Sequence, residues 1–258
     1  MFLIERGLTV SVLAVDPSSR VTGGSILGDK ARMDRLAQQD AAFIRPSPSG
    51  ATLGGVARRT REGMLLCEAA GFDVVLVETV GVGQSETLVA DMVDCFVVLM
   101  QPGAGDELQG IKKGVLEHAD LLVVNKADGD GLPRARTAVS DLSAALRYLR
   151  APSPHWQPQV LAVSSREATG LDALWEAVLA HHEAVEAAGE LAARRSHQRV
   201  HWMWTLVEER LLDRFRGHDA VRARVAGLAV EVAEGRMPPG VAAEELLRAF
   251  GAVREGEK

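Results

Sequence analysis

The sequence has few cysteines, few aromatic residues and no excess of positive charge. Only two of its 258 residues are cysteines, Cys67 and Cys95, and both stand alone in apolar runs. This pattern favours free buried thiols over a disulfide or a metal site. The formal net charge of -6 provides no basic field for nucleic acid. No signal peptide is recognisable, and no apolar run is long enough to span a membrane. We therefore expect a cytoplasmic protein with no nucleic-acid or membrane partner.

What the sequence does have is enough apolar residues, 47% of the chain, to bury the core of one large domain. Short apolar runs alternate with segments of helical period, which predicts a right-handed, mostly parallel α/β sheet. The expected strands lie at 8–15, 42–46, 74–77, 95–100, 119–124 and 159–163. The expected helices between them include 56–70, 134–149 and 171–182.

From about residue 184 the pattern becomes purely helical. Val200, Trp204, Val207 and Leu211 recur at helical spacing and form one apolar stripe. A short helical arm cannot bury such a stripe alone, so it must pack on the α/β domain or on another copy. Of the two we favour a homodimer. We assign residues 1–183 to an α/β domain that lacks its first strand and phosphate loop, and residues 184–258 to a helical dimerisation arm.

The central stretch runs from Val74 to Glu86 and combines a buried strand, an acid and two glycines. Open α/β sheets bind ligands at the carboxyl ends of their strands, where Glu78 lies. In nucleotide-hydrolysing sheets such an acid sits beside Mg²⁺, and Gly81 and Gly83 would let the backbone approach a γ-phosphate. Taken by itself, the stretch fits an ordinary strand and glycine turn equally well.

A more specific motif, Asn125-Lys126-Ala127-Asp128, follows the next apolar strand but one. Guanine presents an N1–H and an exocyclic amine side by side, and the carboxylate of Asp128 can accept from both. Adenine cannot reciprocate, so the motif favours GTP over ATP. Asn125 would brace neighbouring loops, and the stem of Lys126 would cover the base. The loop backing the base would be formed by Ser164, Ser165 and Arg166.

These segments together resemble the MeaB/ArgK-like P-loop GTPases, a group that includes proteins of the MMAA type. The resemblance covers nearly the whole chain and is carried by AVDPSS (14–19), TGGSILGDK (22–30), FIRPSPS (43–49), LGGVA (53–57), LLCEAAGFDVVLVETVGVGQSE (65–86), PGAGDELQGIKKG (102–114), NKAD (125–128) and HWMW (201–204).

The resemblance implies roles for residues at matching positions. Asp16, Asp29 and Glu78 would be the catalytic acids around Mg²⁺ and the attacking water, with Asp16 and Glu78 on the metal. Segments 16–30 and 81–86 would be switches I and II, and 103–114 a third switch. Without the resemblance, a polar helix start would be the preferred interpretation of 103–114. The implied switch residues are Gly81, Gly83, Gln84, Gln109, Lys112 and Lys113.

The resemblance also implies a function. Its members are GTP-hydrolysing chaperones that gate adenosylcobalamin loading and protect methylmalonyl-CoA mutase or a related acyl-CoA mutase. The ArgK-type label also evokes a kinase of amino-acid transport, but the sequence shows no phospho-acceptor or second-substrate site. A non-catalytic dimeric binding module of the same family is the alternative.

The sequence departs from the family in one respect: it contains no GxxGxGKS/T phosphate loop. The backbone N–H groups of that loop cradle the phosphates. Its Lys neutralises the β/γ oxygens, and its Ser/Thr hydroxyl binds Mg²⁺. Either the recorded sequence starts at an internal Met, which we favour, or the chain is a truncated paralogue. We expect this chain alone to hydrolyse GTP poorly, and expect the strands next to the missing one to be exposed.

Two weaker patterns carry less chemistry. His197 and His201 are four residues apart on an expected helix, a metal-compatible spacing, but no carboxylate or cysteine accompanies them. Ser85 and Cys67 lack the histidine and acid that activate a nucleophile. We interpret the histidines as surface residues.

Overall fold

The computed structural model describes residues 1–15, 33–46, 53–79, 89–102, 113–149 and 151–251. Within these ranges the chain forms two compact units, Met1–Arg199 and Val200–Lys258. The boundary between them lies inside helix α9 (Glu190–Gly217), whereas the boundary drawn from the sequence, after residue 183, falls inside helix α8 (Leu171–Ala187).

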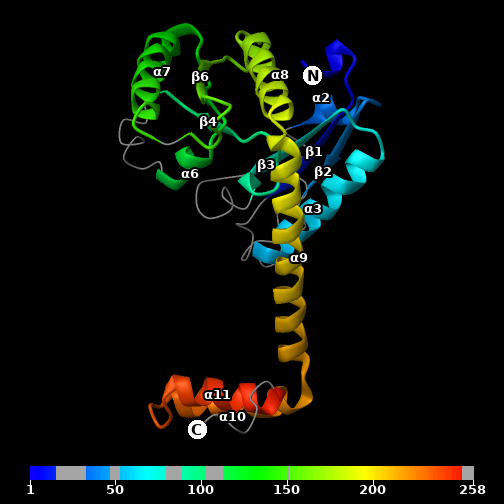
Figure 1. The fold of residues 1–258 in the computed structure, drawn as a ribbon, viewed down its shortest axis with the longest axis vertical. Coiled ribbons are helices and arrows are strands. Elements are labelled where there is room, and N and C mark those ends of the chain that lie inside the picture. The colour runs from blue at the N-terminus through cyan, green and yellow to red at the C-terminus, as the bar shows by residue number, and fades with distance from the viewer. Residues whose placement is uncertain (16–32, 47–52, 80–88, 103–112, 150, 252–258) are drawn as a thin grey trace. The chain divides into compact units, whose positions relative to one another are not determined.

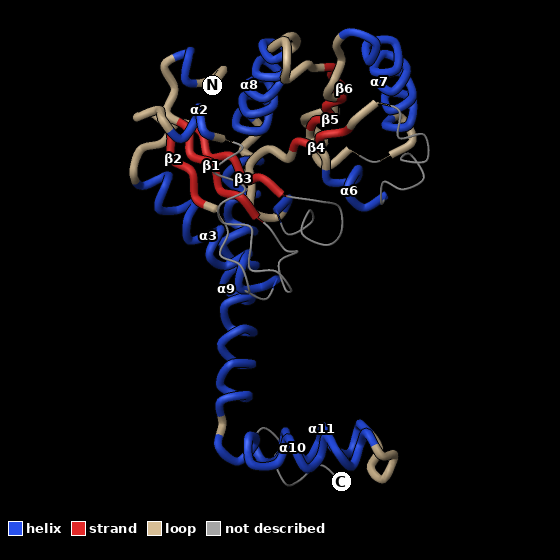
Figure 2. Tube along the Cα trace, turned by 180° about the vertical axis from the view of Figure 1, so that it is seen from behind, coloured by secondary structure: helices blue, strands red, loops and turns tan. Residues whose placement is uncertain are grey.

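The first unit contains two three-stranded parallel sheets (Figures 1 and 2). All four strand pairs are parallel, which confirms the expected α/β class. The described strands fall into two sheets, because β3 and β4 are not paired among the described residues. One sheet has the order β2-β1-β3 and consists of β1 (Val10–Val15), β2 (Ala42–Arg45) and β3 (Val74–Thr79). The other has the order β4-β5-β6 and consists of β4 (Val97–Met100), β5 (Leu121–Val124) and β6 (Gln159–Ala162).

The edge strands β3 and β4 are much more exposed than the central strands. Every residue of β1 and β5 is buried, whereas Leu76 on β3 is 44% exposed and Leu99 on β4 is 68% exposed. Parallel sheets normally have both faces covered, so apolar side chains open to solvent are unusual there. Both of these edge strands therefore present apolar side chains to solvent.

Helices cover both faces of the second sheet. Leu122 and Val124 of β5 pack against α7 (Leu132–Leu146), while Leu121 packs in a cluster with Ala177 of α8. Successive side chains of a strand point to opposite faces, which explains this division. Among the described residues the unit also contains α2 (Asp34–Ala37), α3 (Leu53–Ala69), α6 (Lys113–His118) and the first part of α9, with 3-10 turns at Ile4–Arg6 and Gly129–Gly131.

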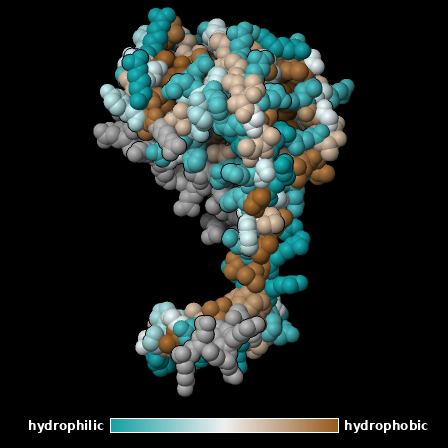
Figure 3. Space-filling model, viewed as in Figure 1, coloured by the Kyte–Doolittle hydropathy of each residue, from teal (hydrophilic) through white to brown (hydrophobic). Residues whose placement is uncertain are grey.

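The second unit consists of the distal part of α9 and a helical hairpin of α10 (Asp219–Ala233) and α11 (Pro239–Phe250). The ring of Phe250 contacts those of Phe215 and His218, which fastens α11 to the end of α9. Distal α9 carries exposed apolar side chains (Figure 3), which are Val200, Met203, Trp204, Val207, Leu211 and Leu212. None of the described helices is long and apolar enough to cross a membrane.

Candidate functional site

The carboxyl ends of β4, β5 and β6 meet at one edge of the second sheet. The backbone N–H of Asn125 donates to Met100 O at 2.8 Å, and that of Ala127 donates to Val163 O at 3.0 Å. These bonds continue the pairing past the ends of β5 and β6. They bring the predicted base-binding motif at 125–128 next to Ser164 and the residues that follow it.

Asn125 braces this edge. Its side-chain oxygen accepts from the backbone N–H of Lys126 at 2.8 Å, and from the N–H and hydroxyl of Ser165 at 3.1 and 2.9 Å. One amide oxygen thus joins the loop after β5 to the loop after β6.

The carboxylate of Asp128 is oriented by a buried hydroxyl. Ser164, which is fully buried, donates its O–H to Asp128 Oδ2 in a short hydrogen bond. The same hydroxyl oxygen accepts from the backbone N–H of Glu167 at 3.0 Å, which fixes the direction of its proton. Asp128 itself remains partly exposed. An oriented, partly exposed carboxylate is suited to accept two parallel N–H bonds from a planar ligand.

Lys126 lies in a left-handed conformation with φ 59°, which is uncommon for a residue other than glycine. Its ammonium donates to Gln101 Oε1, 2.8 Å away, at the exit of β4. The loop also requires Gly131, because a Cβ there would lie 2.5 Å from Lys126 O. Sequence reasoning missed Gln101 and Gly131; the turn-forming run Gly129-Asp130-Gly131 was the available signal for the second.

The other predicted site residues are less fully placed. Glu78 lies near the end of β3 with an exposed side chain, and Arg166 is exposed in the loop after β6. Lys113 begins α6, and its side chain is not among those described. The remaining predicted residues lie outside the described residues: Asp16, Asp29, Gly81, Gly83, Gln84, Gln109 and Lys112.

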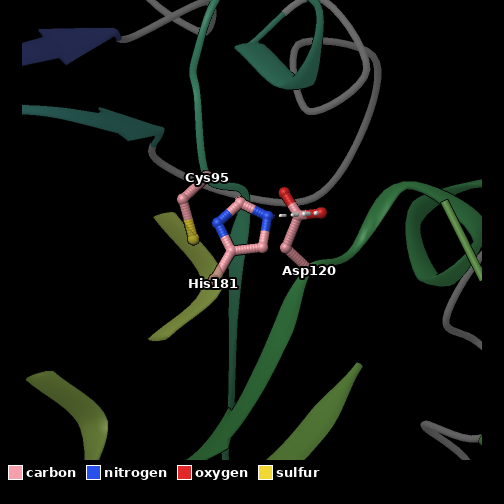
Figure 4. Close-up of side chains that lie close together, drawn as sticks. All are labelled: Cys95, Asp120 and His181. Carbon is pink, nitrogen blue, oxygen red and sulfur yellow. Dashed lines mark ion pairs between the residues drawn. The ribbon is translucent and has the colours of Figure 1, made fainter. Parts of the chain in front are cut away.

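A second polar cluster lies at the opposite end of β4 and β5 and was missed by sequence reasoning. Cys95, Asp120 and His181 each offer a ligand-type atom, all within 4.8 Å of one another (Figure 4). His181 Nε2 approaches Asp120 Oδ1 at 3.3 Å, but neither ring nitrogen has a hydrogen-bond partner of good geometry among the described residues. We treat the 3.3 Å approach as an electrostatic contact.

The electrostatics of this cluster do not favour a metal ion. Burial raises the pKa of the Asp120 carboxyl, but His181, the Arg194 guanidinium and the Phe96 N–H outweigh it and hold the pKa below its ordinary value. Asp120 already has a charged partner, because Arg194 Nη1 lies 3.1 Å from its Oδ2. Burial, and then the Asp120 carboxylate, raise the pKa of the Cys95 thiol to about 12, so it is not poised as a thiolate ligand.

The structure shows the state of the two cysteines and of the histidine pair. Cys67 and Cys95 are both free thiols. His197 and His201 are exposed on α9 and belong to no group of potential metal ligands among the described residues.

The comparison with known proteins identifies the family. The model of the family described as methylmalonyl Co-A mutase-associated GTPase MeaB matches residues 1–220. The chain belongs to the MeaB family of GTPases. This confirms the resemblance found from the sequence motifs and the expected P-loop GTPase type of fold.

Relatives and solved structures support the same assignment. A putative GTPase of Caulobacter vibrioides is 59% identical over 96% of this chain and 76% of its own length. A mouse (Mus musculus) protein named methylmalonic aciduria type A homolog, mitochondrial, is 48% identical over 96% of this chain and 60% of its own length. A crystal structure titled LAO/AO transport system kinase matches with a TM-score of 0.72 and 41% identity, over 97% of this chain and 74% of that one.

Proposed function

We propose that this MeaB-family chain binds guanine nucleotide at the edge formed by the ends of β4, β5 and β6. The observation that supports this proposal best is the carboxylate of Asp128, which the buried Ser164 hydroxyl orients while leaving it partly exposed. Guanine would donate its N1–H and amine to that carboxylate, and adenine would not. Lys126 would lie along the base, and Ser165 and Arg166 would close the loop behind it.

Glu78 and Asp16 would hold the Mg²⁺ that accompanies GTP. Magnesium prefers hard oxygen ligands from one or two carboxylates together with phosphate oxygens. Glu78 fits this requirement, since its exposed side chain lies near the carboxyl end of a parallel strand. Mg²⁺ would neutralise charge on the phosphates during hydrolysis. The role of Asp29 beside the attacking water is proposed from the family resemblance alone.

The biological role we propose is that of a GTP-dependent chaperone for an adenosylcobalamin-dependent acyl-CoA mutase. The family description names methylmalonyl-CoA mutase, which makes that enzyme the first partner to test. The chain would gate cobalamin loading and protect the mutase from inactivation. GTP would act by favouring one arrangement of the switch segments that the mutase senses.

The second unit would form a homodimer. Six large apolar residues of distal α9 are exposed, namely Val200, Met203, Trp204, Val207, Leu211 and Leu212. A second copy of the same helix offers the same stripe, so one symmetric contact would bury both. The proposed site of action is the cytoplasm.

Nucleotide titration of the purified chain tests this function. We expect GDP and GTP to bind, ATP to bind at least tenfold more weakly, and GTP to bind more tightly than GMP. The alternative, a non-catalytic binding module, requires guanine nucleotides to bind without dependence on the γ-phosphate. Equal affinity for ATP and GTP would contradict guanine recognition by Asp128.

A further inference from the structure

The first turns of α9 are fastened to the segments that lead into β4 and β5. Arg194 Nη1 donates to the backbone oxygen of Asp94 at 2.6 Å and to Asp120 Oδ2 at 3.1 Å. Asp94 lies shortly before β4, and Asp120 lies immediately before β5. A single guanidinium therefore touches the entry of both strands.

The next residue of α9 adds a second attachment. Arg195 Nε donates to Asp94 Oδ1 at 2.9 Å, and its Nη2 contacts Asp94 Oδ2 and, at 3.5 Å, Glu68 of α3. One turn later, Gln198 Nε2 donates to Val93 O at 2.9 Å. The paired N–H groups of Arg195 meet both carboxylate oxygens of Asp94, a geometry that fixes orientation as well as distance.

The Arg194–Asp120 pair differs from an ordinary surface ion pair. Asp120 is 1% exposed and Arg194 is 21% exposed, so solvent screens their attraction little. The Phe96 N–H donates to Asp120 Oδ2 at 2.8 Å, and His181 lies against Oδ1. These contacts hold the Asp120 carboxylate in place independently of Arg194, which reduces the side-chain entropy lost when the two residues pair.

The two ends of these strands face different functional elements. Asp120 precedes β5, and Asn125 follows it at the candidate guanine site. Likewise Phe96 precedes β4, and Gln101, which accepts from Lys126, follows it. Each strand has four residues, or roughly 13 Å at about 3.3 Å per residue. Because β5 is completely buried, it connects its two ends as a stiff element.

We propose that Asp94, Asp120, Arg194 and Arg195 form a clamp, the α9 clamp, through which guanine-nucleotide binding stabilises the start of α9. The proposal rests on the proposed function, since it takes the nucleotide to bind at the far ends of β4 and β5. Nucleotide bound there would order the second sheet, and the clamp would pass that ordering to α9. Coupling of this kind is reciprocal, so a closed clamp would also tighten nucleotide binding.

Hydrogen exchange on the full chain, with and without saturating GDP, tests the proposal. The variants are Arg195→Gln and Asp94→Asn, which remove opposite partners of the more exposed pair and should leave the fold intact. The control is Arg248→Gln, which removes the same charge from an exposed pair with Glu244 inside α11. Exchange is read at residues 190–199, and the GDP dissociation constant is measured on the same samples.

In the parent and in Arg248→Gln we expect GDP to slow exchange at residues 190–199 by about fivefold, at the low end of measured couplings. In Arg195→Gln and Asp94→Asn we expect less than about a twofold slowing, and a GDP dissociation constant raised about threefold. Equal slowing in all four proteins with unchanged GDP affinity would overturn the clamp and leave the proposed function standing. Absence of GDP binding by the parent would overturn the proposed function and the clamp with it.

Discussion

Removal of the Arg194 guanidinium should destabilise the first unit far more than removal of its neighbour Arg195. In Arg194→Ala the Asp120 carboxylate, which is 1% exposed in the parent, loses its charge partner. Breaking a buried pair costs about 3–5 kcal/mol, and the partial exposure of Arg194 places this case near about 3 kcal/mol. Arg195→Ala breaks a pair whose side chains are 43% and 32% exposed, so we expect a loss of about 0.5–1 kcal/mol.

Hydrogen exchange of the four β5 amides, Leu121–Val124, measures this difference within the first unit alone. At about 1.4 kcal/mol per factor of ten, Arg194→Ala should speed their exchange roughly a hundredfold, and Arg195→Ala by less than about tenfold. Adding Asp120→Asn to Arg194→Ala should recover part of the loss, because the uncompensated charge is then gone. Equal acceleration by the two single variants, or no recovery in the double variant, would refute the reasoning.

Three further predictions concern other parts of the chain. With its thiol pKa raised to about 12, Cys95 should resist iodoacetamide at pH 8 in the native protein and react after unfolding in urea; rapid native alkylation read by mass spectrometry would contradict the described burial. Gly131→Ala should weaken GDP binding at least tenfold, since the new Cβ would lie 2.5 Å from Lys126 O. The control Gly227→Ala, in an open position of α10, should leave GDP binding unchanged and stabilise the helix by up to about 1 kcal/mol. Equal GDP affinity of both variants would count against the loop geometry. Trp204→Glu should convert a dimer to monomers in sedimentation velocity, and a persisting dimer would argue against the α9 stripe as its interface.

The lowered pKa of Asp120 also contributes to the acid dependence of stability. Because the folded-state pKa lies below the ordinary value of about 3.9, the group stabilises the fold above that pH. The contribution is lost as the pH falls from about 4 through the folded pKa. An Asp120→Asn variant should therefore show a shallower loss of stability below pH 4 than the parent, followed by circular dichroism. A parallel acid response in both proteins would contradict the assignment.

Local chemistry made much of the fold predictable. The apolar run 119–124 predicted β5, because a strand covered on both faces needs no alternation of polar and apolar residues. Gly71 predicted the end of α3, and its φ of 84° is the left-handed conformation that glycine adopts past a helix end. The motif at 125–128 predicted the candidate site, because it follows a buried strand and its Asp128 carboxylate can accept both N–H groups that guanine presents. These features depend on residues close together in sequence.

The features that were missed depend on contacts between distant segments. Asp120 and His181 are ordinary residues in sequence, and only packing of α8 and α9 on the sheet brings them together with Arg194. The contact between Gln101 and Lys126 has the same character, as no spacing rule predicts it.

The central claim is that the carboxylate of Asp128 recognises guanine. Calorimetric titration of the parent and of Asp128→Asn with GDP and xanthosine diphosphate tests it most directly. Xanthine carries a carbonyl where guanine carries its amine, so an amide pairs with it better than a carboxylate does. The parent should prefer GDP and the variant should prefer the xanthine nucleotide, with each preference about 10–100-fold for hydrogen bonds to a charged group. An unchanged preference for GDP in Asp128→Asn would contradict the account.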